Sequence, residues 1–187
     1  MDRYKARLVV KRYTQTYGVN YFETFSPVAQ LNSIWILFSI AINMEWPLFQ
    51  LDVKNAFLYG DLKEQVYMEQ PPGYIAQGEN IVCRLRKAIY GLKQSPRAWF
   101  EKFSMIISGI EFACCHSDHS VFVRRTKSSS VILAVYVDDI LLTGSDSVTL
   151  AETNEYLKRH FVTKDMGKPR YFLGIEVAYQ KYELLLF

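Results

Sequence analysis

Two adjacent acids, Asp138 and Asp139, lie within an otherwise apolar stretch that runs from Val131 to Thr143. The residues on both sides are mainly aliphatic and β-branched, which is typical of two strands, and the acids are expected at the bend between them. Like charges a few ångströms apart disfavour joint ionisation unless a cation neutralises them. The pair therefore predicts a metal site, although aspartate is also common in ordinary β-turns.

Asp52 repeats this pattern, because it lies where a predicted apolar strand at 48–53 runs out. The chain is expected to continue with a helix at 96–110, a strand, a strand at 131–137 that leads to the acids, and a helix at 149–161. This order predicts an α+β fold, a split β-α-β-β-α arrangement with a four-stranded antiparallel sheet backed by two helices. The ends of its first and third strands would lie side by side, so Asp52 and Asp138 would meet. Two metal ions about 4 Å apart, as in-line phosphoryl transfer requires, need such neighbouring carboxylates.

Local signals predict several further elements. They are a short strand at 6–10, a helix at 31–44 that is buried on most sides, a helix with Ser95 as its N-cap, a capping box formed by Thr149 and Glu152, and a single strand at 171–179 with one buried face.

Composition predicts a globular protein, since half of the 187 residues are hydrophobic and the formal net charge is only +3. The cations are unevenly distributed along the chain. One run lies within the first twelve residues and a second run lies between residues 84 and 97; they comprise Arg3, Lys5, Arg7, Lys11, Arg12, Arg84, Arg86, Lys87, Lys93 and Arg97. Such density suits a polyanionic partner, although each run is equally consistent with a solvated face.

The cysteines and the hydropathy exclude other classes. There is no secretory signal near Met1 and no apolar run long enough to span a bilayer, so we expect a soluble, intracellular protein without a membrane partner. An odd number of cysteines, two of them adjacent, favours reduced thiols. Cys114, Cys115, His116 and His119 lack the usual spacing of zinc ligands, and no zinc is expected.

Five motifs then occur in a fixed order. They are YKARLVVKRYTQTYGVNYFETFSPVAQLNS at 4–33, LDVKNAF at 51–57, YGLKQSPRAWF at 90–100, YVDD at 136–139 and YFLGIEVA at 171–178. With these motifs the chain resembles the reverse transcriptase of copia-type LTR retrotransposons from end to end. The resemblance implies a polymerase palm at about 48–59 and 94–187, with partial fingers at about 1–47 and 60–93. It also implies a fragment of a longer Pol polyprotein, from which the thumb, ribonuclease H, integrase and protease are absent.

The resemblance also implies roles for individual residues. Asp52, Asp138 and Asp139 match the catalytic carboxylates, and together with Val53 they would bind two Mg²⁺ ions, for which Mn²⁺ is a possible substitute. Phe57 matches the aromatic steric gate that excludes a ribose 2′-hydroxyl. Six residues are expected to bind the nucleotide: Lys5, Arg7, Phe57, Tyr90, Gly91 and Gln94. Five are expected at the template or primer: Ser95, Tyr136, Phe172, Leu173 and Gly174. Lys164 would protonate the leaving pyrophosphate.

The implied function is RNA-directed DNA polymerisation by a two-metal mechanism, on an RNA or DNA template with a primer and deoxynucleoside triphosphates. The remaining Pol segments would be partners, in a cytoplasmic virus-like particle. Two positions depart from the family pattern, since Arg12 replaces the glycine of KGY and Trp35 stands where a basic residue is usual. Because the expected absence of the thumb and of part of the fingers removes phosphate contacts, we expect the isolated chain to bind primer–template weakly and to extend it poorly or not at all. A catalytically inactive relic that binds nucleic acid and a different two-metal phosphotransferase remain as alternatives.

Overall fold

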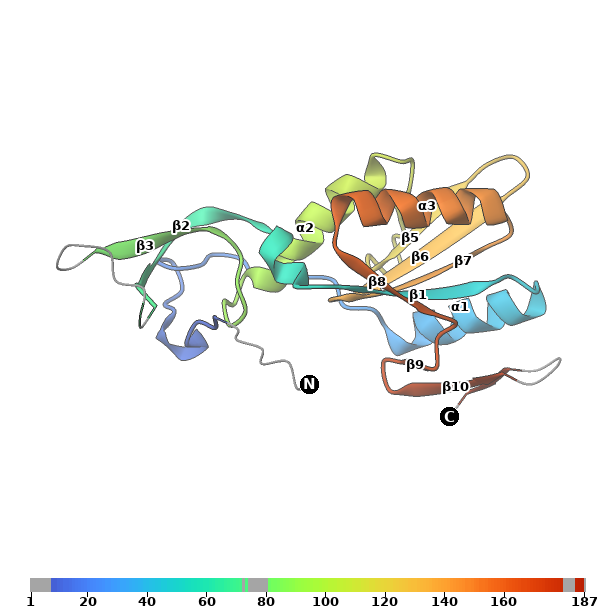
Figure 1. Ribbon diagram of the computed structural model, residues 1–187, viewed down its shortest axis with the longest axis horizontal. Coiled ribbons are helices and arrows are strands. Elements are labelled where there is room, and N and C mark those ends of the chain that lie inside the picture. Colours follow the sequence, from blue (N-terminus) through green and yellow to red (C-terminus); the bar gives the residue numbers. More distant parts are fainter. Residues whose placement is uncertain (1–7, 72, 74–80, 180–183, 187) are drawn as a thin grey trace. The chain divides into compact units, whose positions relative to one another are not determined.

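The computed structural model describes residues 8–71, 73, 81–179 and 184–186 (Figure 1). Its elements, in chain order, are η1 (Arg12–Thr14), α1 (Leu31–Asn43), β1 (Leu48–Val53), η2 (Ala56–Tyr59), β2 (Asp61–Glu69), β3 (Val82–Lys87), α2 (Ser95–Ser108), β4 (Ala113–Cys114), β5 (Val121–Arg125), β6 (Ser130–Tyr136), β7 (Asp139–Gly144), α3 (Ser147–His160), β8 (Thr163–Gly167), β9 (Tyr171–Phe172), β10 (Ile175–Tyr179) and β11 (Leu184–Leu186). No helix of these described ranges is long and apolar enough to cross a membrane.

The chain divides into two compact units. The first comprises residues 1–26 and 57–103, and the second comprises residues 27–56 and 104–187. The partition expected from the sequence separates 27–47 from the strand that follows, whereas α1 and β1 belong to the same unit.

The second unit is built on a six-stranded sheet with the order β4-β5-β6-β7-β1-β8, in which every neighbouring pair is antiparallel. The prediction of an antiparallel sheet with helices is confirmed, but the predicted pairing was wrong. The neighbour of β1 is β7, the strand that follows the acids, and β6 lies one position further away. The physical reason is the tight β6–β7 hairpin, whose second strand is apolar and buried from Ile140 to Gly144, so it takes an inner position.

Helices cover both faces of this sheet (Figure 1). Side chains of α1, namely Ile34, Leu37, Phe38 and Ala41, share a core cluster with Leu48 of β1 and Leu141 of β7. Because side chains alternate along a strand, Gln50 and Asp52 continue the face on which Leu48 lies. In the figure α3 lies on the opposite side of the sheet. The strand that carries Asp52 is therefore held between two packed layers.

Two predictions about helices need correction. The 31–44 segment is amphipathic rather than buried on most sides, since Trp35 and Ile36 are exposed while the opposite face packs inward. The helix α3 begins at Ser147 and not at Thr149, because the carboxylate of Asp146 accepts hydrogen bonds from the backbone N–H groups of Val148 and Thr149 and so caps the helix earlier.

The predicted strand at 171–179 is also wrong, because the segment is a hairpin. Phe172 pairs with Ile175, and the loop residues Leu173 and Gly174 both have positive φ, of 52° and 81°. Two consecutive positive φ values are characteristic of a type I′ turn, which reverses the chain within two residues. The alternation of apolar residues is interrupted there, so the buried residues are Phe172, Ile175 and Val177.

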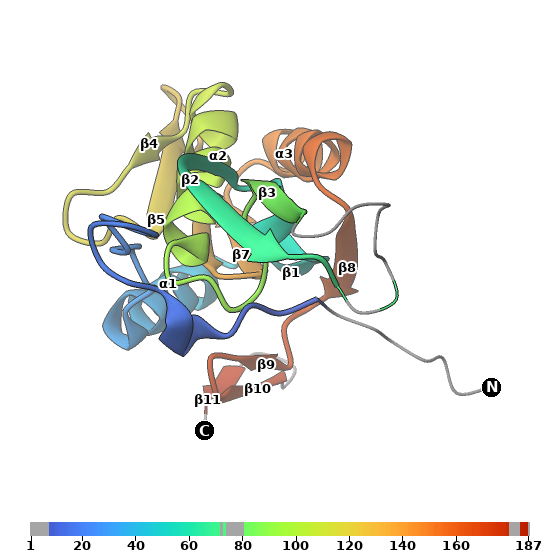
Figure 2. The same ribbon diagram turned by 90° about the vertical axis from the view of Figure 1, so that its left-hand side faces the viewer.

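The first unit contains the β2–β3 ribbon, whose strands are labelled in Figure 2. Val66, Ile89 and Leu92 form a small buried core beneath it. The outward face of the ribbon carries Tyr67 directly opposite Arg84, and both side chains are exposed. This unit thus has an exposed, partly basic sheet face.

Candidate active site

The three predicted acidic residues lie at neighbouring ends of β1 and the β6–β7 hairpin in the second unit. Asp52, near the end of β1, lies directly opposite Asp139, the first residue of β7. Side chains that are directly opposite on antiparallel strands lie on one face with Cβ atoms about 4.5–5.5 Å apart. The carbonyl of Asp138 accepts a hydrogen bond of 2.7 Å from the backbone N–H of Val53. The sequence placed both acids at the bend, whereas only Asp138 is in the loop.

The loop before Asp139 has an unusual backbone. Tyr136 pairs with Asp139, which leaves Val137 and Asp138 as a two-residue turn. Val137 has a φ of 51°, and positive φ at the first loop position alone is the pattern of a type II′ turn. Glycine normally occupies that position, because positive φ is strained for a β-branched residue. The local strain lies next to the acids.

The surroundings of Asp139 raise the pKa of its carboxyl. Burial is the main cause, and the nearby charges of Asp138 and Asp52 add to it, while a hydrogen bond from Gln50 acts in the opposite direction. The Nε2 atom of Gln50 lies 3.1 Å from Oδ1 of Asp139. Gln50 was not predicted from the sequence. Its position two residues before Asp52, on the same strand face, is the signal that could have identified it.

A positively charged side chain lies on the other side of Asp52. Lys164 of β8 is its direct partner in the register, and the Lys164 side chain is exposed. Asp139, Asp52 and Lys164 are thus aligned across three adjacent strands, β7, β1 and β8. The predicted general acid therefore lies beside a predicted metal ligand, although its role as a proton donor stays a prediction.

The carboxylates suit a hard divalent cation but do not enclose one. Within the described ranges no group of three histidine, cysteine or acidic side chains is arranged to hold a metal ion. Mg²⁺ usually binds through one or two carboxylates and completes its shell with waters and substrate phosphates, so a closed protein cage is not required. The donor chemistry and the mutual repulsion felt by Asp139 fit such a site.

In the first unit, two predicted nucleotide-binding residues are in contact. The rings of Phe57 and Tyr90 have centroids 4.9 Å apart at an interplanar angle of 57°. Gly91, which follows, has a φ of 93°, and a Cβ atom there would lie only 2.2 Å from the carbonyl oxygen of Val10. Glycine is therefore required at this position by the close approach of two backbone segments.

Gln94 and Ser95 are fully buried. The amide of Gln94 accepts a hydrogen bond from Nε2 of Gln15 at 3.0 Å and donates one to the carbonyl of Asn20 at 2.9 Å. The hydroxyl of Ser95 donates to the carbonyl of Ile89 at 2.6 Å. In this arrangement both side chains hold the preceding loop in place, and direct contact with a nucleotide, template or primer would require these bonds to break. Ser95 is also the first residue of α2 rather than its N-cap.

The second basic run divides into two groups. Lys87, Lys93 and Arg97 are engaged within the unit: Lys87 pairs with Asp61, Nζ of Lys93 lies 4.6 Å from the centre of the Tyr21 ring, and Arg97 pairs with Glu64 at 2.6 Å. Arg84 and Arg86, in contrast, are exposed on β3. Lys5 and Arg7 lie outside the described residues, as do the first two residues of the predicted strand at 6–10; in its described part, Val9 forms an isolated bridge with Tyr90 and no named strand.

Apart from Ser95, the residues predicted at the template or primer lie in two hairpins of the second unit. Phe172 is buried in the core cluster, and Tyr136 and Leu173 are partly buried against it. Gly174 is exposed in the turn. Packing accounts for Phe172 in this structure, and contact with a primer stays a prediction for all four.

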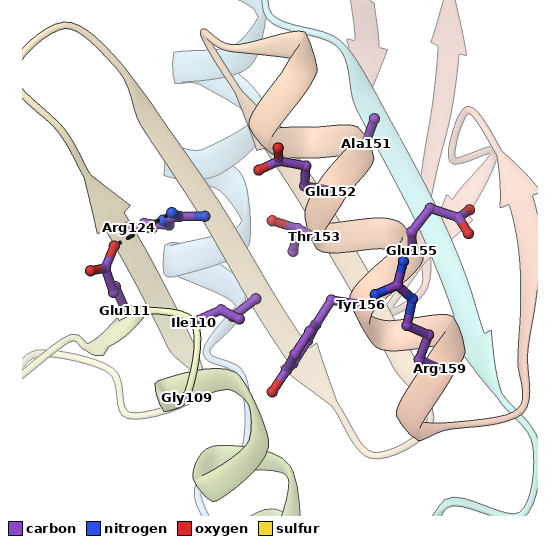
Figure 3. Close-up of a pocket in the computed structure, with 10 residues that line it drawn as sticks. All are labelled: Gly109, Ile110, Glu111, Arg124, Ala151, Glu152, Thr153, Glu155, Tyr156 and Arg159. Carbon is purple, nitrogen blue, oxygen red and sulfur yellow. Dashed lines mark hydrogen bonds and ion pairs between the residues drawn. The ribbon is translucent and has the colours of Figure 1, made fainter.

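A cavity of about 710 Å³ lies elsewhere in the second unit, between the end of α2, β5 and α3 (Figure 3). Its lining includes Arg124, Glu152, Tyr156 and Arg159, and none of the predicted site residues. Side chains of opposite charge occur together there, so the cavity has no strong preference for one charge.

Comparison with known proteins identifies the family of the chain. A family model described as reverse transcriptase (RNA-dependent DNA polymerase) matches residues 1–186. The chain is 50% and 49% identical, over 177 residues, to the retrovirus-related Pol polyproteins from transposons RE1 and RE2 of Arabidopsis thaliana, covering 94% of this chain and 12% of each relative. It is 41% identical over 181 residues to the corresponding polyprotein from transposon TNT 1-94 of Nicotiana tabacum, covering 96% of this chain and 14% of that relative.

The chain therefore spans only a small part of the length of these relatives. The resemblance to copia-type retrotransposon Pol polyproteins is confirmed over nearly all of its own length. The chain belongs to the reverse transcriptase (RNA-dependent DNA polymerase) family.

Proposed function

We propose that this chain is the catalytic portion of an RNA-directed DNA polymerase, which adds deoxynucleotides to a primer 3′-hydroxyl on an RNA or DNA template. The observation that carries the proposal is the meeting of Asp52, Asp138 and Asp139 where β1 ends beside the β6–β7 hairpin. The family to which the chain belongs supports the same reaction.

We assign the second unit to the palm and the first unit to the fingers. The second unit contains the sheet with the acids, which is the expected content of a palm. The first unit contains Phe57, Tyr90 and the exposed β2–β3 ribbon. In this assignment α1 is part of the palm.

The aspartates, Gln50 and Lys164 of the second unit have different roles in this proposed reaction. The three aspartates provide the negative charge that would hold two Mg²⁺ ions, and Gln50 donates a hydrogen bond to one of these carboxylates. When bound, magnesium would favour deprotonation of the primer 3′-hydroxyl and neutralise charge on the triphosphate. Lys164, the register partner of Asp52, would donate a proton to the departing pyrophosphate. In the first unit, the ring of Phe57, packed against Tyr90, supplies the bulk that would exclude a 2′-hydroxyl.

The ribbon in the first unit supports a polynucleotide as the partner. Tyr67 is 51% exposed and lies opposite Arg84, with Arg86 two residues further along the same strand face. Arginine side chains that neutralise phosphates release the counterions condensed on the nucleic acid, which favours binding. An exposed aromatic ring can stack on a base. The remaining segments of the Pol polyprotein are expected as further partners.

Primer extension tests the proposal directly. Purified chain is incubated with poly(rA)·oligo(dT), dTTP and Mg²⁺, next to an Asp138→Asn variant, and duplex binding is measured on the same samples. The proposal expects slow but measurable extension by the wild-type chain, a rate about 10²–10³-fold lower for the variant, and similar duplex binding by both. Extension at the wild-type rate by Asp138→Asn would contradict it.

A nucleic-acid-binding protein without catalysis is the second candidate. It is favoured by the exposed β2–β3 ribbon. The same experiment separates the two functions, since this candidate expects salt-sensitive binding of the duplex but no extension at any Mg²⁺ or Mn²⁺ concentration.

A further inference from the structure

Gln50 is a buried polar residue in the middle of a sheet. It is 9% exposed and lies on β1, which has β7 on one side and β8 on the other. Its Cα partner on β7 is Leu141, so Asp139 lies diagonally across from it, two residues along. Such diagonal neighbours are about 7–8 Å apart at Cα, a distance that a glutamine side chain can bridge.

The hydrogen bond that Gln50 makes is directed at one carboxylate oxygen. Nε2 of Gln50 donates to Oδ1 of Asp139 at 3.1 Å, which leaves Oδ2 of Asp139 for another partner. A lysine in this place would neutralise the carboxylate and compete with a cation, whereas a neutral amide fixes its orientation and leaves its charge intact. Asp52, the direct partner of Asp139, lies on the same face.

We propose that Gln50 is a positioning residue, which holds Asp139 so that its free oxygen joins Asp52 and Asp138 in binding a divalent cation. The inference rests on the proposed function, because it takes these aspartates as the cation site of the polymerase. Groups that orient a metal ligand without touching the metal typically contribute about 10–100-fold to metal affinity.

Thr143 provides a matched control. It is fully buried in β7 of the same sheet, and its hydroxyl donates to the carbonyl of Pro47 at 2.8 Å, away from the acids. Thr143→Val removes a buried hydrogen bond with little change of shape, as Gln50→Met does. Both variants are expected to lower the melting temperature, but only Gln50→Met removes a bond to an aspartate.

The experiment is a titration of the full chain with Mn²⁺ alone, in which free Mn²⁺ is followed by electron paramagnetic resonance. Gln50→Met should weaken Mn²⁺ binding by about 10-fold or more, and Thr143→Val should leave it unchanged. Wild-type affinity in folded Gln50→Met would overturn the proposal, and so would an equal loss in Thr143→Val. Asp52→Asn and Asp138→Asn are titrated in parallel. Wild-type Mn²⁺ affinity in both of these would overturn the proposed cation site itself, whereas failure of Gln50→Met alone would leave that site standing.

A second measurement does not depend on the folding of a variant. In the wild-type chain, the side-chain amide resonances of Gln50 should shift when MgCl₂ is added, because the carboxylate to which the amide donates acquires a cation. Unchanged Gln50 resonances at a magnesium concentration that shifts the backbone resonances of Asp52 and Asp138 would overturn the positioning role.

Discussion

Two hairpins of the second unit reverse direction within two residues, yet they do so with different residues. The β9–β10 turn uses Leu173 and Gly174, both with positive φ, and glycine accommodates the second position. The β6–β7 turn uses Val137 and Asp138, and places the positive φ on a β-branched residue. Backbone strain of this kind costs about 1–3 kcal/mol and persists where the surrounding structure enforces it.

The difference indicates that the strained backbone of the β6–β7 turn is maintained because it positions the acids. The strained turn is fixed by pairing with β7 up to Asp139 and by the hydrogen bond from Val53 to Asp138. It presents an acid at the second loop position and another directly after it. In the other hairpin the corresponding position after the loop is Ile175, a core residue. The sheet thus maintains a costly backbone conformation where three carboxylates meet.

The largest expected effect comes from removing a charge in the strained turn. Asp138→Asn should lower primer extension by about 10²–10³-fold, the loss typical when one group is removed from a preorganised electrostatic site. Rates are measured at saturating primer–template. Asp146→Asn is the control, because asparagine also caps helices well and should leave both α3 and extension intact.

Gly174→Ala should have the next largest effect. Its φ of 81° is unfavourable for any residue with a Cβ atom, so the free energy of unfolding should fall by about 1–2 kcal/mol. Urea denaturation measures the change. A stability equal to that of wild type would mean that the second turn tolerates positive φ as readily as the first.

Val137→Gly should act in the opposite direction. Relief of strain at a φ of 51° is partly offset by the entropy of glycine, which leaves a gain of about 1 kcal/mol in the free energy of unfolding. Extension should nevertheless decrease, because Asp138 would be held less firmly. A clear loss of stability would show that the valine side chain contributes more through packing than it costs in strain.

The smallest effect concerns the pH dependence of stability. Burial and two neighbouring acids raise the pKa of Asp139 in the folded chain above its ordinary value of 3.8. Protonation of Asp139 therefore favours folding, and this contribution is lost as pH rises through the folded pKa. Asp139→Asn should be more stable than wild type near pH 7 and should lose this advantage below about pH 4. Melting curves across this range test the sign, and an advantage that grows at low pH would refute it.

Much of this architecture could be predicted from local patterns. Apolar periodicity that ends at a polar residue predicts three features: the helix at 31–43, the strand at 48–53 and the acids of the hairpin. The meeting of Asp52 with the acid pair was also predictable, because the elements allow few topologies. Which strand pairs with β1 could not be predicted, because the choice between β6 and β7 depends on which of the two can be buried on both faces.

Other features depend on contacts between segments far apart in the sequence. Nothing local distinguishes Gln50 from other strand glutamines until β7 is placed beside it. The 171–179 hairpin was missed because Leu173 occupies a position that usually carries asparagine, aspartate or glycine. The predicted capping box was wrong because Asp146, three residues before Thr149, caps the helix, so Thr149 lies within the first turn.

A change of metal preference tests the central claim, that Asp138 binds a cation used in polymerisation. Thiolates favour soft cations and carboxylates favour hard ones, so Asp138→Cys should be inactive with Mg²⁺ and regain extension with Cd²⁺. Wild-type chain in the same metals controls for Cys83, Cys114 and Cys115, which are free. Our account predicts that rescue occurs only in the variant. Full activity of Asp138→Cys with Mg²⁺, or an equal loss with every metal while the wild-type chain remains active, would contradict it.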